Sequence, residues 1–464
     1  MKQITYNSNN QFFFIVLVLI MFLFGCNTFT EVELPPNQVN RNAIFEEKRT
    51  AEAAISDLYA FQRDEGILSG SISGLSESLS LYTDEYITYG EQSSDNFLFN
   101  THNILPSTRK VKNFWDSSYN TIYNANSAIQ GLEKSSITDK NFTARLLGEA
   151  YFMRALMHFY LGQLYGDIPY VTSTDYRTNQ SISKNTIEEV NELILKDLEK
   201  AISLVPEDYV TVNRIRPNKN TVKALLCRLF LYNEQWENAQ SISSEIIQSP
   251  FYDLQVPLDK VFLKDSPGTI WQLMSQDPGQ NTKEGNNFIL LSIGNRYSAL
   301  NNVYVNAFES GDQRKDEWIG SLNSGGNLLY FPFKYKEDTY TSVSKEFSKV
   351  FRIAEIYLIR AEAFLRMGKL EEAQSDINRI RNRAGLTPIT TLDPNVLETI
   401  LIQERKSELF MEFGHRWFDL KRFSKAELVL SPIKSGWGES SYLLPIPETE
   451  LGANPNLKPQ NPGY

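Results

Sequence analysis

Two stretches of the sequence repeat each other and decide the fold: residues 224–247 read ALLCRLFLYNEQWENAQSISSEII, and residues 358–381 read LIRAEAFLRMGKLEEAQSDINRIR. At one constant offset, large apolar and small residues recur in both: Phe230 and Phe364, Leu231 and Leu365, Ala239 and Ala373, Ile246 and Ile380. Each stretch has two helical patterns around a short polar turn, and the alanines let the two helices approach closely. The repeat therefore predicts tetratricopeptide-like helical hairpins in a mainly α fold.

Helical patterning extends outward from the repeat over much of the chain. Apolar residues recur at helical spacing in four further segments: residues 46–61, 115–132, 142–165 and 186–204. The segment 142–165 ends at a Gly-Asp-Ile-Pro terminator, and Thr186 is a favourable N-cap for the next helix. These two segments are expected to form a third, looser helical pair.

Two long regions lack this periodicity. Residues 68–112 and 251–347 are rich in polar and aromatic residues, and the second contains short apolar pieces at 269–273 and 330–333 that indicate brief strands. Loops of this length are uncommon inside a helical fold and are usually functional. We therefore expect a loop-rich part packed on the helical scaffold.

The N-terminus predicts the compartment. Residues 12–24 form an apolar run that is too short to span a bilayer and fits a secretory signal. The run ends in Leu23-Phe24-Gly25-Cys26, which resembles a lipobox, so cleavage before Cys26 and attachment of diacylglycerol to its sulfur are expected. The alternative is a plain secretory signal with an incidental cysteine. Residues 26–40 are polar, contain prolines, and are typical of a tether.

Composition and motifs disfavour several classes of function. The formal net charge of -10 opposes binding to nucleic acid. His102, His158 and His415 have no metal-ligand spacing, and no nucleophile motif or phosphate-binding loop is present, so neither metal, cofactor nor catalysis is predicted. Cys227 lies among leucines and is expected to be a buried core thiol. A pair of catalytic carboxylates remains open, because sequence does not give their separation.

Five segments together resemble the SusD/RagB family of outer-membrane nutrient-binding lipoproteins. They are the helix with Trp115, Tyr119 and Ile122; residues 149–155 leading to 165–170 (YGDIPY); residues 352–363; residues 404–422, with GHRWFDLKR; and the proline-containing ending 445–464. Each motif alone is weak, but their order behind a lipobox is specific. The resemblance covers nearly all of the chain after Cys26.

The resemblance implies a fold, a location and a role. The fold is a SusD-like α-α superhelix of tetratricopeptide-like hairpins with a loop-rich part packed on them. The chain then divides into a lipoprotein signal (1–25), a tether (26–40), an N-terminal helical region (41–250) and a C-terminal SusD/RagB region (251–464), with its loop-rich insertion at 251–347. Family members bind oligosaccharides or sometimes peptides at the cell surface and deliver them to a SusC-like TonB-dependent transporter.

Ligand contacts are expected from aromatic and polar side chains in the two loop regions, because sugar faces lie flat on aromatic rings while sugar hydroxyls take hydrogen bonds. The candidates are Tyr82, Asp84, Tyr86, Tyr89, Asp95, Asn96, Phe97, Arg296, Tyr297, Tyr304 and Trp318. Well-known family members place a Trp in the first of these loops, whereas this chain has none before Trp115. The nature of the ligand is therefore open.

Three hypotheses follow. The first is a surface lipoprotein that captures glycan or another nutrient for a transporter. The second is a lipoprotein scaffold that binds proteins through its helical hairpins. The third is a polysaccharide-degrading enzyme, for which the sequence offers no nucleophile or acid/base pair.

Overall fold

The repeated sequence folds as two antiparallel helical hairpins in the computed structural model, which describes residues 41–294 and 297–464. The first hairpin is α10 (Lys219–Tyr232) with α11 (Trp236–Gln248), and the second is α15 (Ile353–Arg366) with α16 (Leu370–Arg383). Both confirm the hairpin prediction. The expected signal (1–25), Cys26, the tether (26–40) and Arg296 lie outside the described residues.

The two hairpins close with the same turn. The amide of Gln235 donates to the carbonyl of Phe230 at 2.8 Å, and the amide of Lys369 donates to the carbonyl of Phe364 at 2.9 Å. The residue before each donor has a left-handed backbone: Glu234 at φ 57° and Gly368 at φ 73°. This helix-ending bond suits glycine, which has no Cβ to clash, so the first hairpin makes the same turn with a less favourable residue.

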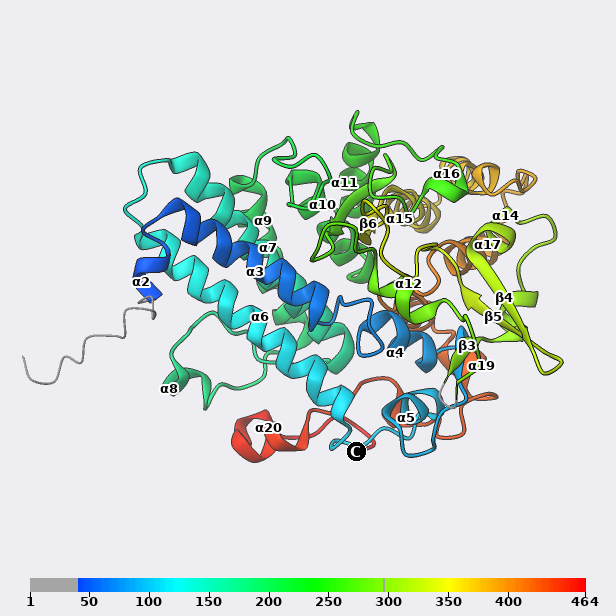
Figure 1. Cartoon of the computed structure of the whole chain (residues 1–464), viewed down its shortest axis with the longest axis horizontal. Helices are drawn as coiled ribbons and strands as arrows, with labels where there is room; N and C mark the ends of the chain where they lie inside the picture. Colours follow the sequence, from blue (N-terminus) through cyan, green and yellow to red (C-terminus); the bar gives the residue numbers. More distant parts are fainter. Residues whose placement is uncertain (1–40, 295–296) are drawn as a thin grey trace, which may run out of the picture. The chain divides into compact units, whose positions relative to one another are not determined.

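The other predicted helices are also present and pack in series (Figure 1). They are α3 (Lys48–Asp64), α6 (Arg109–Lys134), α7 (Lys140–Tyr165) and α9 (Ile187–Leu204). Each helix packs on the next in the order α3, α6, α7, α9, α10, α11, α15, α16 and α17 (Pro394–Glu408). Thr186 caps α9 in a capping box with Glu189, as its sequence predicts. Among the described residues, no helix is long and apolar enough to cross a membrane.

The loop regions contain more regular structure than predicted. Residues 68–112 include α4 (Leu75–Tyr82), β1 (Tyr86–Thr88) and α5 (Asp95–Thr101). In the second region β2 (Thr269–Leu273) and β5 (Asn327–Pro332) confirm the two expected strands. The region also forms short helices and strands: α12 (Lys283–Phe288), β3 (Ser298–Leu300), α13 (Asn302–Asn306), α14 (Gln313–Trp318) and β4 (Ile319–Ser324). Strand β6 (Ser348–Arg352) begins directly after this region. All eight residues of α4 are buried, including its serines and Glu77. Its sequence therefore does not divide into one polar and one apolar helix face, which is the pattern that predicts a surface helix.

Two small antiparallel sheets join distant parts of the chain. One has the strand order β1-β3-β5-β4, and the other pairs β2 with β6. Because β1 lies before residue 250 and β3 after it, the two sequence regions 41–250 and 251–464 share a sheet. Residues Phe45–Tyr464 cluster as one compact unit, and α2 (Arg41–Ile44) belongs to a separate N-terminal unit.

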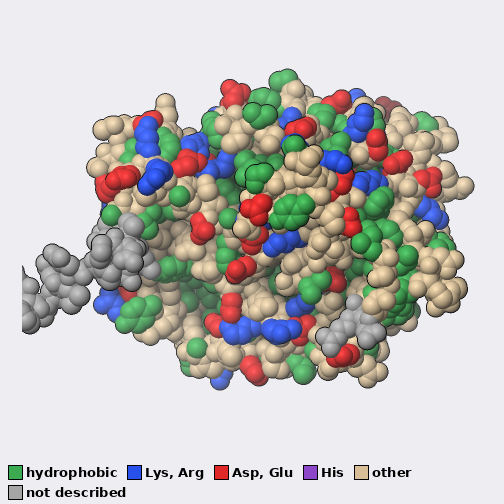
Figure 2. All heavy atoms as spheres, in the orientation of Figure 1, with side chains coloured by type: hydrophobic (Ala, Val, Ile, Leu, Met, Phe, Trp, Pro, Cys, Tyr) green, Lys and Arg blue, Asp and Glu red, His purple; other side chains and the backbone are tan. Residues whose placement is uncertain are grey.

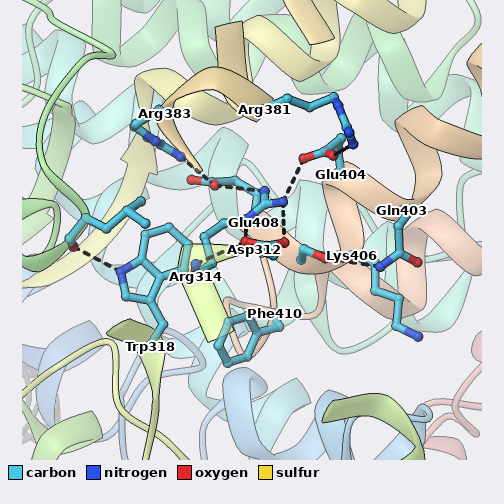
Figure 3. A network of polar contacts seen from close by, with 12 residues as sticks. Asp312, Arg314, Trp318, Arg381, Arg383, Gln403, Glu404, Lys406, Glu408 and Phe410 are labelled. Atoms are coloured by element: carbon cyan, nitrogen blue, oxygen red, sulfur yellow. Dashed lines mark hydrogen bonds and ion pairs between the residues drawn. The ribbon is translucent and has the colours of Figure 1, made fainter. Parts of the chain in front are cut away.

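A buried network of charges ties the loop-rich part to the last helices (Figure 3). Glu404 and Glu408 on α17 form ion pairs with arginines of other elements. Glu404 accepts from Arg314 of α14 and from Arg381 of α16, each at 2.8 Å. Glu408 accepts from Arg352 at 2.8 Å. Burial alone would raise the pKa of Glu408, but the surrounding guanidinium groups outweigh it and hold that pKa well below its usual range.

The segment GHRWFDLKR (414–422) is structural as well. Arg416 of α18 (His415–Arg422) pairs with Asp84, and Asp419 pairs with Arg405 and Arg422, so these charges fasten α18 to its neighbours. Cys227 is buried, which confirms the predicted core thiol, and burial raises the pKa of this thiol to about 12. Acidic and basic side chains are interspersed over the face shown in Figure 2, without a continuous patch of one sign.

Candidate functional site

A pair of stacked tyrosines lies where β1 meets β3. The register pairs Ile87 with Ala299 and Thr88 with Ser298. The ladder continues one step further, because the amide of Tyr89 donates to the carbonyl of Tyr297 at 2.8 Å. Neighbouring residues on paired strands bring their side chains together.

The two rings form a platform at the surface. Their centroids are 4.7 Å apart and their planes differ by 20°. Tyr89 is 50% exposed, and Tyr297 is half-buried. An exposed ring that another ring holds in place offers a flat apolar face with little conformational freedom left to lose on binding. We call this pair the tyrosine platform.

A polar pocket of about 620 Å³ adjoins the platform. Tyr297 forms part of its wall. Its other walls come from α4, β1, α5, the start of α6 and the segment after α12; the residues that matter below are Ser73, Glu77, Tyr86, Asp95, Asn96, Lys110 and Asn113. A concave site of this size beside an aromatic face can hold a small ligand and fix its orientation through polar groups.

The buried end of the pocket carries a cluster of three polar side chains. Asn96 donates from Nδ2 to Glu77 Oε1 at 3.1 Å, and Lys110 donates to the Asn96 amide oxygen. Lys110 Nζ lies 4.0 Å from Glu77 Oε2. Within the described chain, Glu77 Oε2 accepts no hydrogen bond although it is buried. The nearest charge to this buried oxygen is therefore the ammonium group of Lys110.

Burial shifts the pKa values of two side chains in this cluster, Glu77 and Lys110, in opposite directions. Burial raises the pKa of Glu77 to about 7, against the opposing effect of the Lys110 charge. Burial also lowers the pKa of Lys110. Among the described residues, no group of three or more His, Cys, Asp and Glu side chains is placed to hold a metal ion.

The structure brings together five of the residues that the sequence nominated. Tyr89 and Tyr297 form the platform, while Tyr86, Asp95 and Asn96 line the pocket beside it. Tyr86 reaches the pocket only with an edge, because its side chain is buried and its hydroxyl donates to the Ser298 carbonyl at 3.0 Å. Whether these side chains touch ligand stays a prediction.

Three nominated aromatic residues lie in the core, and their expected ligand contacts need correction. Tyr82, Tyr304 and Trp318 are at most 1% exposed. Their polar atoms donate to backbone carbonyls, Tyr82 to Ser441 and Tyr304 to Lys406. The indole of Trp318 donates to the carbonyl of Leu258 at 3.0 Å. Such satisfied, buried rings stabilise the fold and present no face to a ligand.

Two other nominated residues lie beside the pocket without lining it. Asp84 forms an ion pair with Arg416 at 2.8 Å. Burial alone would raise the pKa of Asp84, but the charges of Arg416 and Lys406 lower it to about 2. The Asp84 carboxylate is therefore ionised at neutral pH, and its ion pair with Arg416 stabilises the fold. Phe97 is half-buried in the first turn of α5, where its amide donates to the Ser94 hydroxyl at 3.2 Å.

Sequence reasoning missed Glu77 and Lys110. A signal for Glu77 was present, because it is an isolated acid in the run LSESLSLY, whose neighbours are apolar or small. An acid in such a run is either exposed to solvent or buried beside a partner, and buried acids of this kind are enriched at functional sites. Lys110 gave no comparable signal, since basic residues near the start of a surface helix are common.

Comparison with known proteins identifies the family. The profile of a family described as starch-binding and associating with the outer membrane matches residues 71–231, and the SusD family profile matches residues 282–464. The chain belongs to the SusD/RagB family. SusD-like protein P2 of Formosa agariphila is 27% identical over an alignment of 508 positions, which covers 97% of this chain and 98% of that protein.

Solved structures of SusD proteins have the same fold. A SusD superfamily protein from Bacteroides vulgatus superposes with a TM-score of 0.80 at 19% identity, over 91% of this chain and all of the other. A laminarin-binding SusD-like protein gives a TM-score of 0.76 at 23% identity, over 90% of this chain and 100% of its own. The SusD-like, mainly helical fold predicted from the sequence is confirmed. Of the tyrosine platform, Tyr89 lies in the first family match and Tyr297 in the second.

Proposed function

We propose that this SusD-family protein captures oligosaccharide on the tyrosine platform at the outer surface of the cell and passes it to a SusC-like TonB-dependent transporter. The observation that carries the proposal is the stacked pair Tyr89 and Tyr297 beside a pocket that is lined by polar side chains, Asp95 and Asn96 among them. A sugar ring has apolar C–H faces and a rim of hydroxyl groups, and this site offers a partner to each. The laminarin-binding relative supports a glycan as the ligand.

The proposed location rests on the N-terminus. A diacylglycerol on Cys26, with a further acyl chain, gives the multiple acyl chains that stable membrane anchoring requires. The family profile described as associating with the outer membrane supports the same location. Delivery to a transporter is the family role implied by the resemblance.

We propose binding without turnover. The relatives reported above are described as SusD-like or laminarin-binding proteins rather than as hydrolases. If the purified protein released reducing sugar from a polysaccharide that it binds, the enzyme hypothesis would replace this one.

The helical hairpins are poor candidates for protein docking, because the chain itself covers them. Arg228 of α10 is buried and donates to the carboxylate of Glu355 on α15, and its second partner is the hydroxyl of Tyr160 at 2.9 Å. Strand β2 packs on α10 and on α3. The chain itself thus occupies these inward faces of the hairpins, which favours glycan capture over the scaffold hypothesis.

The test is a binding screen of the purified protein on an array of polysaccharides and oligosaccharides that detects high-micromolar affinity. Tyr89→Ala is expected to weaken binding to the glycan that scores by about tenfold or more, since loss of an anchoring ring at the centre of a site costs roughly 1–2 kcal/mol or above. Tyr340→Ala, which removes another exposed tyrosine outside the platform, is the matched control. No binding across the array, or equal loss in both variants, would contradict the proposal.

A further inference from the structure

A second hollow continues from the polar pocket. It has a volume of about 570 Å³ and lies between α6 and the segment that follows α3. Figure 1 shows the end of α3 beside the first half of α6, and the two helices are in contact. Ser73 and Asn113 line both the pocket and this hollow, so the two share a wall. We call the second hollow the α6 groove.

Seven of the eleven residues that line the α6 groove have polar side chains, and the others include Phe61 and Phe114. Its polar side chains are Asp64, Glu65, Ser73, Asn113, Asp116, Ser117 and Asn120. Asn113, Asp116 and Asn120 lie three to four residues apart, so they follow one side of the helix along its axis, and all three are exposed. A row of amides and carboxylates along a helix can accept and donate to a ligand that runs parallel to it.

The charge of the groove restricts its ligand. Its ionisable lining residues are all acids, Asp64, Glu65 and Asp116, and among the described residues no lysine or arginine lines it. Asp64 is balanced by Arg63 and Lys283, and Asp116 by Lys112, which stand outside the lining. An anionic polymer would bring its charges against Glu65 and the shared carboxylates, whereas a neutral sugar would not.

We propose that the ligand is an extended neutral oligosaccharide, which begins on the tyrosine platform, fills the polar pocket and continues along the α6 groove. This inference rests on the proposed function and specifies its ligand. From Lys110 to Asn120 the helix rises about 15 Å, which exceeds the length of a single sugar ring. The protein therefore selects polymer fragments over mono- and disaccharides.

The experiment measures affinity against chain length. Full-length protein in detergent is titrated calorimetrically with size-graded oligosaccharides of laminarin, starch and xylan. For the series that binds, affinity is expected to rise about tenfold or more as the chain grows long enough to enter the groove, and then to level off. Uronate oligosaccharides of alginate are expected to show no such gain, and an equal gain for them would overturn the assignment to neutral chains.

Paired variants locate the effect. Glu65→Ala with Asn120→Ala removes two side chains that line only the groove, and is expected to abolish most of the gain for long chains while leaving short-chain affinity unchanged. Asn141→Ala with Glu188→Ala changes the same residue types at exposed positions outside the groove and is the control. Flat length dependence, or a groove variant that behaves like its control, overturns the inference while platform binding survives. No binding in any series overturns the proposed function and this inference together.

Discussion

At the scale of single residues, two buried glutamates show how their neighbours decide a charge. Glu408 is surrounded by guanidinium groups, and its pKa is held well below the usual range. Glu85 is equally buried but accepts from the neutral Ser80 hydroxyl, and burial raises its pKa to about 7. Within the described chain its Oε1 accepts no hydrogen bond. The first carboxylate stabilises the fold when it is ionised, and the second when it holds its proton.

Glu85 makes one contribution to the pH dependence of stability. Burial also raises the pKa values of Glu77 and Glu346 to about 7, so these two groups act in the same direction. The folded state holds the Glu85 proton more tightly than the unfolded chain does, so the stabilisation is present below the unfolded pKa of about 4.3 and is lost as the pH rises through about 7. Between about pH 5 and pH 8, the wild-type protein is expected to lose on the order of 1–3 kcal/mol of unfolding free energy through this group. Glu85→Gln is expected to lose less over the same range.

Urea unfolding at the two pH values measures this difference. Glu188→Gln, at an exposed position on α9, is the control and should follow the wild type. Parallel losses in the wild type and in Glu85→Gln would show that Glu85 does not titrate in this range.

At the nominated residues, the structure shows which side chains lie at the surface and which lie in the core. The sequence nominated Tyr89 and Tyr297 because aromatic residues gather in polar loop regions, and those two are at the surface. The same reasoning nominated Tyr82 and Trp318, which are buried because their segments fold into short helices packed under the sheet. Composition indicates in which regions aromatic residues can be exposed. Whether a given side chain is buried depends on contacts with distant segments, and a local sequence pattern does not contain that information.

At the scale of elements, the repeat was the most informative part of the sequence. Helices of 13 or 14 residues with strong apolar spacing were predicted with their turns, and both turns have the same geometry. Short elements such as β1, with three residues, were missed because their form is imposed by a partner strand rather than by their own sequence.

The difference between the two turns leads to a stability prediction. Glu234 adopts φ 57°, which costs a residue with a Cβ roughly 1–2 kcal/mol, whereas its counterpart is Gly368. Glu234→Gly is therefore expected to raise the unfolding free energy by about 0.5–1 kcal/mol, after the entropic cost of glycine is subtracted. Denaturant unfolding at constant pH measures the change.

The matched control applies the same substitution three residues later. Glu237 lies in the first turn of α11 at an exposed position. Glu237→Gly is expected to destabilise by about 0.5–1 kcal/mol, because glycine is a poor helix former and the acid interacts favourably with the helix N-terminus. If both variants destabilise equally, the left-handed backbone at Glu234 carries no strain.

At the scale of the whole molecule, the predicted anchor determines where the site works. Replacement of Cys26 by Ser removes the only proposed attachment point for lipid, and is expected to move the protein from the membrane fraction to the soluble fraction. Cell fractionation and immunoblotting measure the distribution. Cys227→Ala, which removes the buried thiol, should remain with the membrane. Equal membrane association of the wild type and Cys26→Ser would instead favour a plain secretory signal.

The tyrosine platform joins two parts of the chain that lie far apart in sequence, since Tyr89 belongs to β1's segment and Tyr297 to that of β3. A glycan bound across both rings therefore acts as a thermodynamic cross-link, which only the folded chain can accept. By mass action, a ligand at one hundred times its dissociation constant adds about 2.7 kcal/mol to the unfolding free energy. The melting temperature of the protein thus becomes a label-free reporter of which glycan it recognises.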